Sequence, residues 1–183
     1  MFTEWREILV CPIDRTPLGT NAAGQFTCST CGFTPRLRTV GGRAILDFRA
    51  LDTPQEVTVT FAIPIPPLDH YELARTHFRA PSKDCPHYSR REIRRQFGTK
   101  LDKGIQYYCQ ELLRNHGPDV RILDLGCGNG GNRRYLQSLG FRNILAVDWS
   151  AKGADLLVDA HRLPLRTGSF RMGMSTAVFE HFY

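Results

Sequence analysis

The segment ILDLGCGNGG, residues 122–131, places an acidic side chain directly before a glycine-rich turn. Gly126, Gly128 and Gly131 also fit the G-x-G-x-x-G spacing of a dinucleotide-binding turn. A dinucleotide would present a pyrophosphate here, and the carboxylate of Asp124 would repel that anion. S-adenosylmethionine carries an ammonium and a sulfonium group and no phosphate. Asp124 therefore favours S-adenosylmethionine over a dinucleotide as the ligand of this turn, and the glycines let the backbone approach it closely.

Two further acids follow apolar segments farther along the chain. Asp148 ends NILAVD, where two carboxylate oxygens can accept both ribose hydroxyl protons. Trp149 can pack on adenine, and Asp159, which precedes Ala160, can accept a hydrogen bond from the adenine amino group. The alternatives are a helix N-cap for Asp148, core packing for Trp149, and a cap or turn role for Asp159.

The elements that must position these residues alternate between helix and strand. LDKGIQYYCQELLRNHGP predicts a helix that stops at Gly117 and Pro118, and NRRYLQSLG a shorter helix closed by Gly140. RILDL, NILAVDWS, ADLLVDA and RMGMSTAVFEH predict strands of a parallel sheet with right-handed crossovers, which binds ligands at the carboxyl ends of its strands. The first helix is expected to bury one face, formed by Leu101, Ile105, Tyr108, Cys109, Leu112 and Leu113.

Four of these segments, ILDLGCGNG, AVDWS, VDAHRLPLRTGSF and STAVFEHFY, resemble successive motifs of class I S-adenosylmethionine-dependent methyltransferases of the type 11 group. The resemblance implies an α/β fold, a partial Rossmann-like doubly wound parallel sheet that comprises the first four of seven strands. Arg171 stands where this family often has aspartate. The cofactor-binding residues it implies are Asp124, Gly126, Cys127, Gly128, Gly130, Asp148, Trp149, Asp159 and Ala160.

The sequence ends soon after the fourth strand, so we expect it to be part of a longer protein. The alternative is a degenerate remnant. An apolar last strand would be an open edge, which a protein partner could cover. Methyl transfer in this family is direct and depends on alignment and desolvation of the reactants. His181, next to Glu180, could take a proton from the acceptor, or it could be structural.

The N-terminal region contains a second group of residues that could do chemistry. Cys28 and Cys31 form a C-x-x-C pair followed by Gly32, which is typical of a zinc knuckle. Cys11 and Asp14 form a C-x-x-D pair that could complete four zinc ligands. The alternative is a metal-free ribbon whose cysteines are small buried side chains.

This region resembles the zinc-ribbon family whose stand-alone members activate tRNA and protein methyltransferases. The matching segments are ILVCP, the PL pair at 17–18, FTCSTCGFTP and GGRAIL. RTVGGRAILDF predicts a β-hairpin with a Gly-Gly turn. The family often has cysteine at the position of Asp14, and some of its relatives keep the fold without zinc.

These observations predict a zinc-ribbon-like domain over residues 1–50 and the N-terminal part of a methyltransferase domain over 101–183. Residues 51–100 would form a connector with a proline-rich stretch and a basic helix; Cys85 and His87 there are too few for a zinc site. Within 88–103, arginines recur at helical spacing opposite Ile93 and Phe97. They form either a solvated face or an RNA contact.

Composition agrees with a soluble protein. The 183 residues are 42% hydrophobic and carry a net charge of +6, and the excess of positive charge lies in residues 86–183. We find neither a secretory leader nor an apolar run long enough to span a membrane, so the expected location is the cytoplasm. The six cysteines are then thiols or metal ligands rather than disulfides.

The sequence thus favours an S-adenosylmethionine-dependent methyltransferase. A small-molecule acceptor is favoured, with RNA and protein as alternatives. A non-enzymatic, partner-binding module with a truncated methyltransferase fold is the second hypothesis. A nicotinamide oxidoreductase is the third, and Asp124 and the segment DAHRLP count against it.

Overall fold

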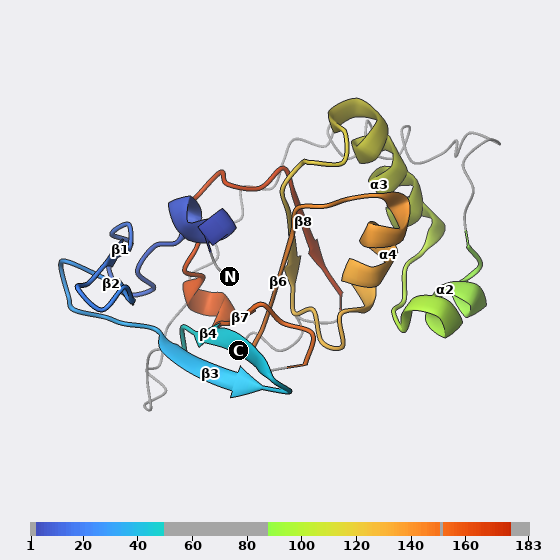
Figure 1. Ribbon diagram of the computed structural model, residues 1–183. Coiled ribbons are helices and arrows are strands. Elements are labelled where there is room, and N and C mark those ends of the chain that lie inside the picture. Colours follow the sequence, from blue (N-terminus) through green and yellow to red (C-terminus); the bar gives the residue numbers. More distant parts are fainter. Residues whose placement is uncertain (1–2, 50–87, 151, 177–183) are drawn as a thin grey trace.

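A six-stranded sheet forms the centre of the computed structural model, which describes residues 3–49, 88–150 and 152–176 (Figure 1). The strand order is β3-β4-β7-β6-β5-β8; all neighbours from β4 to β8 pair in parallel, and β3 is antiparallel to β4. This is the mixed α/β, Rossmann-like arrangement that the sequence predicted. The strands are β3 (Arg36–Val40), β4 (Arg43–Asp47), β5 (Ile122–Leu125), β6 (Ile144–Asp148), β7 (Leu156–Leu157) and β8 (Met172–Ser175).

The strand order reverses direction at β5. The chain runs outward from β5 to β6 and β7, and β8 then pairs on the other side of β5. Leu125 at the end of β5 lies between Val147 of β6 and Ser175 of β8. The carboxyl ends of β5 and β8 therefore flank a topological switch point, where open α/β sheets bind their ligands.

The predicted hairpin forms, and it joins this sheet. β3 and β4 are antiparallel around Gly41 and Gly42, which both have positive φ, as a two-residue hairpin turn requires. β4 then pairs in parallel with β7, so the sheet crosses the boundary predicted at residue 50. Before this hairpin, β1 (Gly19–Thr20) and β2 (Phe26–Thr27) form a separate antiparallel pair.

Two helices precede β5. Helix α2 (Arg90–Phe97) begins with a capping box, in which Ser89 N donates to Glu92 and Glu92 N to Ser89, and it ends at Gly98. Asp102 caps helix α3 (Lys103–His116), which ends at Gly117 as predicted. Both helices contain positions that the apolar spacing had marked as buried, including Ile93, Phe97, Cys109 and Leu112.

The buried face of α3 differs in part from the prediction. Tyr108 was expected to be buried, but it is 45% exposed, and Gln106 and Gln110 are buried instead. The Gln106 amide accepts from Tyr88 N at 2.8 Å and donates to Tyr88 O at 2.9 Å. These hydrogen bonds satisfy the buried amide of Gln106. The buried face of α3 thus contains polar residues that an apolar count does not find.

The connections between the parallel strands differ in length. Helix α4 (Gly131–Leu139) connects β5 to β6, but the described residues between β6 and β7 contain no helix. Asp155 N donates to Ala146 O at 2.8 Å, so this connection returns directly along β6. Between β7 and β8 the structure has a short 3-10 helix, η2 (Ala160–Arg162). No helix among the described residues is long and apolar enough to cross a membrane.

The two faces of the sheet are covered differently. Helices α2, α3 and α4 lie on one side, where Phe97, Tyr135 and Leu136 are core residues (Figure 1). The N-terminal region covers the other side through a 3-10 helix, η1 (Thr3–Ile8), whose Ile8 is fully buried. The N-terminal region thus occupies the place that helices take in a doubly wound fold.

Candidate functional site

The glycine-rich turn lies at the carboxyl end of β5. Gly126, Gly128 and Gly130 have φ angles of 69°, 51° and 74°, in the left-handed region that favours glycine. The backbone N–H groups of Gly126 and Cys127 both donate to the carbonyl of Val147, at 2.9 and 3.1 Å. The turn is therefore anchored on β6, and α4 begins immediately after it.

Asp148, at the end of β6, supports the same turn. Its Oδ2 accepts from Gly128 N at 2.7 Å, and its Oδ1 accepts from Ser150 N at 2.7 Å. A carboxylate has about four lone-pair sites, so two further hydrogen bonds can be accepted. The structure brings together the acid and the glycine turn, which are about 20 residues apart in the sequence.

Asp124 lies beneath the turn, and its residue is fully buried. Its Oδ1 accepts from Asn132 Nδ2 at 2.9 Å, whereas its Oδ2 is buried and has no hydrogen-bond partner among the described residues. Burial raises the pKa of this carboxyl above its ordinary value, although the Asn132 hydrogen bond opposes the shift. An unpaired buried carboxylate oxygen is costly, and a cationic ligand group nearby would offset part of that cost.

Cys127 is also buried in the turn. Burial raises the pKa of its thiol to about 12, so it is neutral at physiological pH and unsuited to act as a nucleophile. Its backbone N–H holds the turn on β6, so its contribution to the site is made by the main chain.

Trp149 is 61% exposed, so its ring does not pack in the core. The Arg49 guanidinium lies over the ring, 5.2 Å from its centroid. The exposed aromatic surface directly follows Asp148, at the edge where the ligand is expected.

Asp159 caps η2, which is the role that the sequence analysis gave as the alternative to adenine binding. Its Oδ1 accepts from His161 N at 2.9 Å and lies 2.8 Å from His161 Nδ1. Ala160 begins η2. The two predicted catalytic residues, Glu180 and His181, lie outside the described residues.

Gly153 belongs to this site, and the sequence analysis did not identify it. Its φ is 64°, and a Cβ atom there would lie 2.7 Å from Gly130 N and 2.8 Å from Gly128 O. The residue therefore has to be glycine for the connection after β6 to pack on the turn. The available signal was a glycine in an unusually short connection between two strands.

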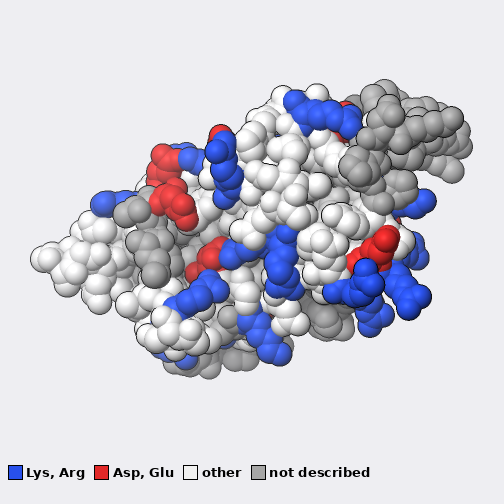
Figure 2. All heavy atoms as spheres, turned by 45° about the vertical axis from the view of Figure 1, so that its right-hand side comes forward, with Lys and Arg blue, Asp and Glu red and all other residues white. Residues whose placement is uncertain are grey.

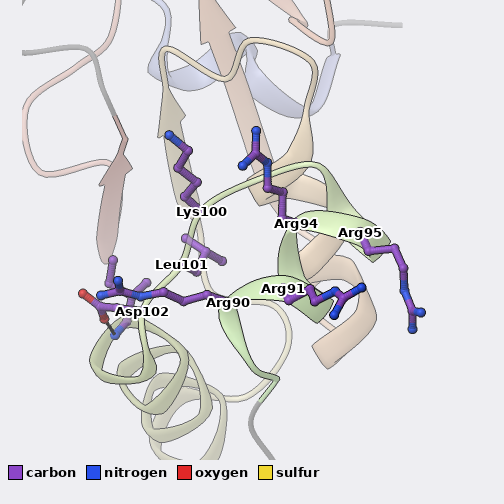
Figure 3. Close-up of a pocket in the computed structure, with 8 residues that line it drawn as sticks. Arg90, Arg91, Arg94, Arg95, Lys100, Leu101 and Asp102 are labelled. Atoms are coloured by element: carbon purple, nitrogen blue, oxygen red, sulfur yellow. Dashed lines mark hydrogen bonds between the residues drawn. The ribbon is translucent and has the colours of Figure 1, made fainter.

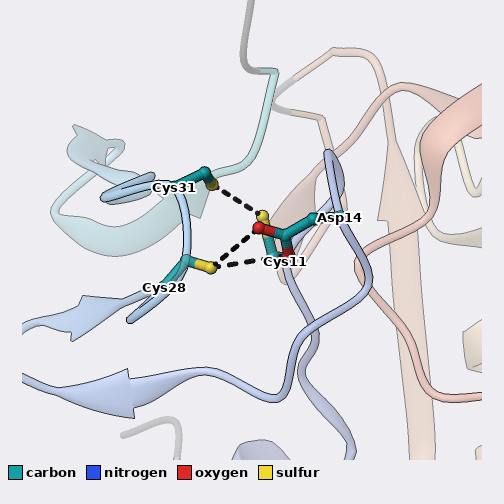
Figure 4. Close-up of side chains that lie close together, drawn as sticks. All are labelled: Cys11, Asp14, Cys28 and Cys31. Carbon is teal, nitrogen blue, oxygen red and sulfur yellow. Dashed lines mark hydrogen bonds between the residues drawn. The ribbon is translucent and has the colours of Figure 1, made fainter.

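The four predicted zinc ligands converge in the N-terminal region (Figure 4). Their ligand atoms all lie within 4.8 Å of one another. Cys11 Sγ and Cys31 Sγ are 3.5 Å apart, and Cys28 Sγ is 3.3 Å from Asp14 Oδ2. Ligands of tetrahedral zinc, with Zn–S near 2.3 Å and Zn–O near 2.0 Å, are about 3.5 to 3.8 Å apart. The donor set and its spacing therefore fit zinc.

The two halves of this cluster have the same backbone geometry. Arg15 follows Asp14 with φ 67°, and Gly32 follows Cys31 with φ 74°. Arg15 N donates to Cys11 O and Gly32 N to Cys28 O, each at 3.0 Å. A hydrogen bond from Thr16 N lowers the pKa of the Asp14 carboxyl, which favours the ionised form that binds metals. Asp14 thus occupies the position that Cys31 occupies in the other half.

Arg15 also joins the cluster to the sheet, a role that the sequence analysis did not predict. Its guanidinium donates to the carbonyl of Leu163 and, at 2.6 Å, to that of Leu165. Leu9 forms a β-bridge with Leu165. These contacts connect the cysteine cluster to the segment that follows η2 and Asp159.

One comparison with protein families covers the part of the chain that contains this turn. Residues 123–183 match a methyltransferase domain model. The match starts in β5 and includes the glycine turn, Asp148 and Asp159. S-adenosylmethionine is the usual methyl donor of such domains. No curated protein matches the chain. The match lies outside the N-terminal region, so the zinc-ribbon resemblance stays a prediction.

Proposed function

We propose that this chain binds S-adenosylmethionine and transfers its methyl group to a small-molecule acceptor. The main support for this proposal is the glycine turn at the switch point of the sheet. Asp148 of β6 holds this turn, and the buried Asp124 lies beneath it. The family match to a methyltransferase domain supports the reaction class. RNA and protein are the alternative acceptors.

Four of the predicted residues would contact or attract the cofactor through their side chains. The free lone pairs of Asp148 would accept the ribose hydroxyl protons while its occupied ones hold Gly128. The exposed Trp149 ring offers its surface to adenine, and Asp159 has a second carboxylate oxygen for the adenine amino group. Asp124 would act on the ammonium by its charge, because the residue is buried below the turn. The bound cofactor would supply the methyl group from its sulfonium.

Two further assignments complete the proposal. We assign a structural zinc ion to Cys11, Asp14, Cys28 and Cys31, because four protein ligands with no open position are typical of structural sites. His181 is our candidate for accepting the proton of the acceptor, with Glu180 beside it.

Calorimetric titration of the 183-residue chain with S-adenosylmethionine tests the cofactor assignment, with NAD as the competing ligand. We expect binding of S-adenosylmethionine alone. Asp148→Ala should weaken it by at least about tenfold, since it removes charge-assisted hydrogen bonds worth about 1.5 to 3 kcal/mol. Asp119→Ala is the matched control, because that carboxylate pairs with the exposed Arg142 in the loop before β6.

Circular dichroism of each variant distinguishes lost binding from lost folding. Binding of NAD in preference to S-adenosylmethionine would overturn the proposal in favour of an oxidoreductase. A folded chain that binds neither ligand would also overturn it, in favour of the partner-binding module.

A further inference from the structure

Helix α2 has one face made of arginines. Ile93 and Phe97 are buried in the core between the helices and the sheet, and the arginines lie at exposed positions of the same helix. Among the described residues, none of these arginines forms a hydrogen bond or an ion pair through its side chain, although Arg95 lies near Glu92. Figure 2 shows basic side chains gathered where α2 lies, with one acidic patch beside them. The arginines are Arg90, Arg91, Arg94 and Arg95.

A cavity of about 730 Å³ lies beside this face, between α2 and the first turn of α3. Leu101, which is 1% exposed, and Ile105 supply its apolar part. In Figure 3, Arg94 and Lys100 extend in the same direction from their backbones, whereas Arg95 extends away from both. Cavities of about 300 to 1,000 Å³ are the usual size for small-molecule sites. The described lining thus combines five cations with an apolar floor and one carboxylate, Asp102, whose Oδ1 accepts from Ile105 N as the cap of α3.

The cavity adjoins the proposed cofactor site through one continuous segment. A Cβ atom on Gly131, the first residue of α4, would lie 2.8 Å from Phe97 O, so α2 ends directly against the glycine turn. Thr99 Oγ1 donates to Asn132 Oδ1 at 2.5 Å, and Asn132 donates to Asp124. Lys100 follows Thr99 and lines the cavity. The cavity therefore adjoins the segment that is hydrogen-bonded through Asn132 to Asp124, the residue proposed to attract the cofactor's ammonium group.

We propose that this cavity binds the anionic group of a small acceptor molecule, a phosphate ester or a carboxylate, and packs an apolar part of that molecule on Leu101 and Ile105. Its role as the acceptor site rests on the proposed function, whereas the anion binding itself does not. A planar guanidinium binds either oxyanion with two parallel hydrogen bonds, and an adjacent ammonium adds a second charge. RNA is less favoured, because the described lining has no aromatic side chain on which a base could stack.

Calorimetric titration of the full chain with octyl phosphate and with octanoate tests this proposal and separates the two anion sources. We expect at least one of them to bind, and Arg94→Gln and Lys100→Gln each to weaken it by about tenfold, since a charge-assisted hydrogen bond is worth about 1.5 to 3 kcal/mol. Arg142→Gln is the matched control: it removes the same charge, but at the opposite end of β6, where Arg142 pairs with Asp119.

Equal weakening by Arg142→Gln would show general charge attraction and overturn the proposal, as would the absence of binding to either amphiphile. Binding of a short oligouridylate in preference to both would overturn it in favour of RNA. Titrating the same variants with S-adenosylmethionine separates the two proposals. If S-adenosylmethionine binds and the amphiphiles do not, only the acceptor site is wrong. The reverse result would contradict the methyltransferase assignment and leave an anion site.

Discussion

The guanidinium of Arg49 lies 5.2 Å from the centroid of the Trp149 ring, and its Nη1 donates to the Trp149 carbonyl at 2.9 Å. The same guanidinium donates to both carboxylate oxygens of Asp47, at 2.8 Å each. Asp47 ends β4 and is 3% exposed. The end of the N-terminal hairpin therefore supports the residue that follows Asp148, and the N-terminal region forms part of the wall of the proposed cofactor site.

Replacing Arg49 should lower the stability of the protein. Arg49→Ala leaves the buried Asp47 carboxylate with Arg38 as its remaining charged partner, so we expect a loss of about 2 to 3 kcal/mol in the free energy of unfolding. Urea denaturation measures it. Arg6→Ala, which removes an exposed arginine bonded to Thr20, should cost less than about 1 kcal/mol. Equal losses in the two variants would contradict a special role for Arg49.

Asp47 should make stability depend on pH in the acid range. Burial would raise the pKa of its carboxyl, but the hydrogen bonds from Arg49 and Arg38 and the charge of Arg49 together outweigh it. The pKa therefore lies below its ordinary value of 3.8. A carboxyl with a lowered pKa in the folded state stabilises the protein above 3.8, and this contribution is lost as the pH falls through the folded-state pKa. The free energy of unfolding should thus fall more steeply with acid in the native chain than in Asp47→Asn. Parallel curves would contradict this prediction.

Asp124→Asn should stabilise the free protein and weaken cofactor binding. Its pKa is raised by burial, so its contribution to stability is present at low pH and lost as the pH rises through the folded-state pKa. At neutral pH the variant should be more stable than the native chain, because it removes a carboxyl whose charged form is disfavoured by burial. The gain should shrink as the pH approaches 3.8.

Thermal melting at several pH values measures this effect, and calorimetry measures the affinity for S-adenosylmethionine. Asp119→Asn, at an exposed carboxyl, serves as the control and should change neither quantity appreciably. A variant less stable than the native chain at neutral pH would show that the Asp124 charge is well compensated in the fold.

Gly153 can be tested against another glycine with similar backbone geometry. Gly153→Ala places a methyl group within 2.7 to 2.9 Å of backbone atoms of the glycine turn, whereas Gly168→Ala has the same sign of φ and no atom within 4 Å. Gly168→Ala should cost only the backbone strain, about 1 to 2 kcal/mol. Gly153→Ala should cost more and should also weaken binding of S-adenosylmethionine. Similar melting temperatures for the two variants would mean that the turn can move away.

Zinc content tests the cysteine cluster. We expect about one zinc ion per purified chain, as four ligands of one site imply, and a lower melting temperature after chelation. Cys28→Ser should lose the metal. Asp14→Cys should retain it, since thiolate is the commoner zinc ligand. Cys109→Ser is the control, because that buried thiol lies on α3, away from the cluster. A native chain that purifies without metal and is insensitive to chelators would contradict the zinc assignment.

Much of the local structure follows from the sequence. The glycines at 41 and 42 specify a hairpin turn, and the helices before β5 end at the glycines that follow them. The two knuckles also follow from their spacing, because two intervening residues bring the ligand atoms of each pair together. These features depend on φ preferences, capping and hydrogen bonds between near neighbours, which a short stretch of sequence contains.

The tertiary structure was needed for every contact between residues that are far apart in the sequence. Only the packed sheet shows that β4 pairs with β7, that Gly153 lies against the glycine turn, and that Arg49 covers Trp149. It also shows that Asp124 is fully buried beneath the glycine turn. Each of these contacts joins segments that are remote in sequence, so it depends on strand order and on close packing, which no local pattern of residues encodes.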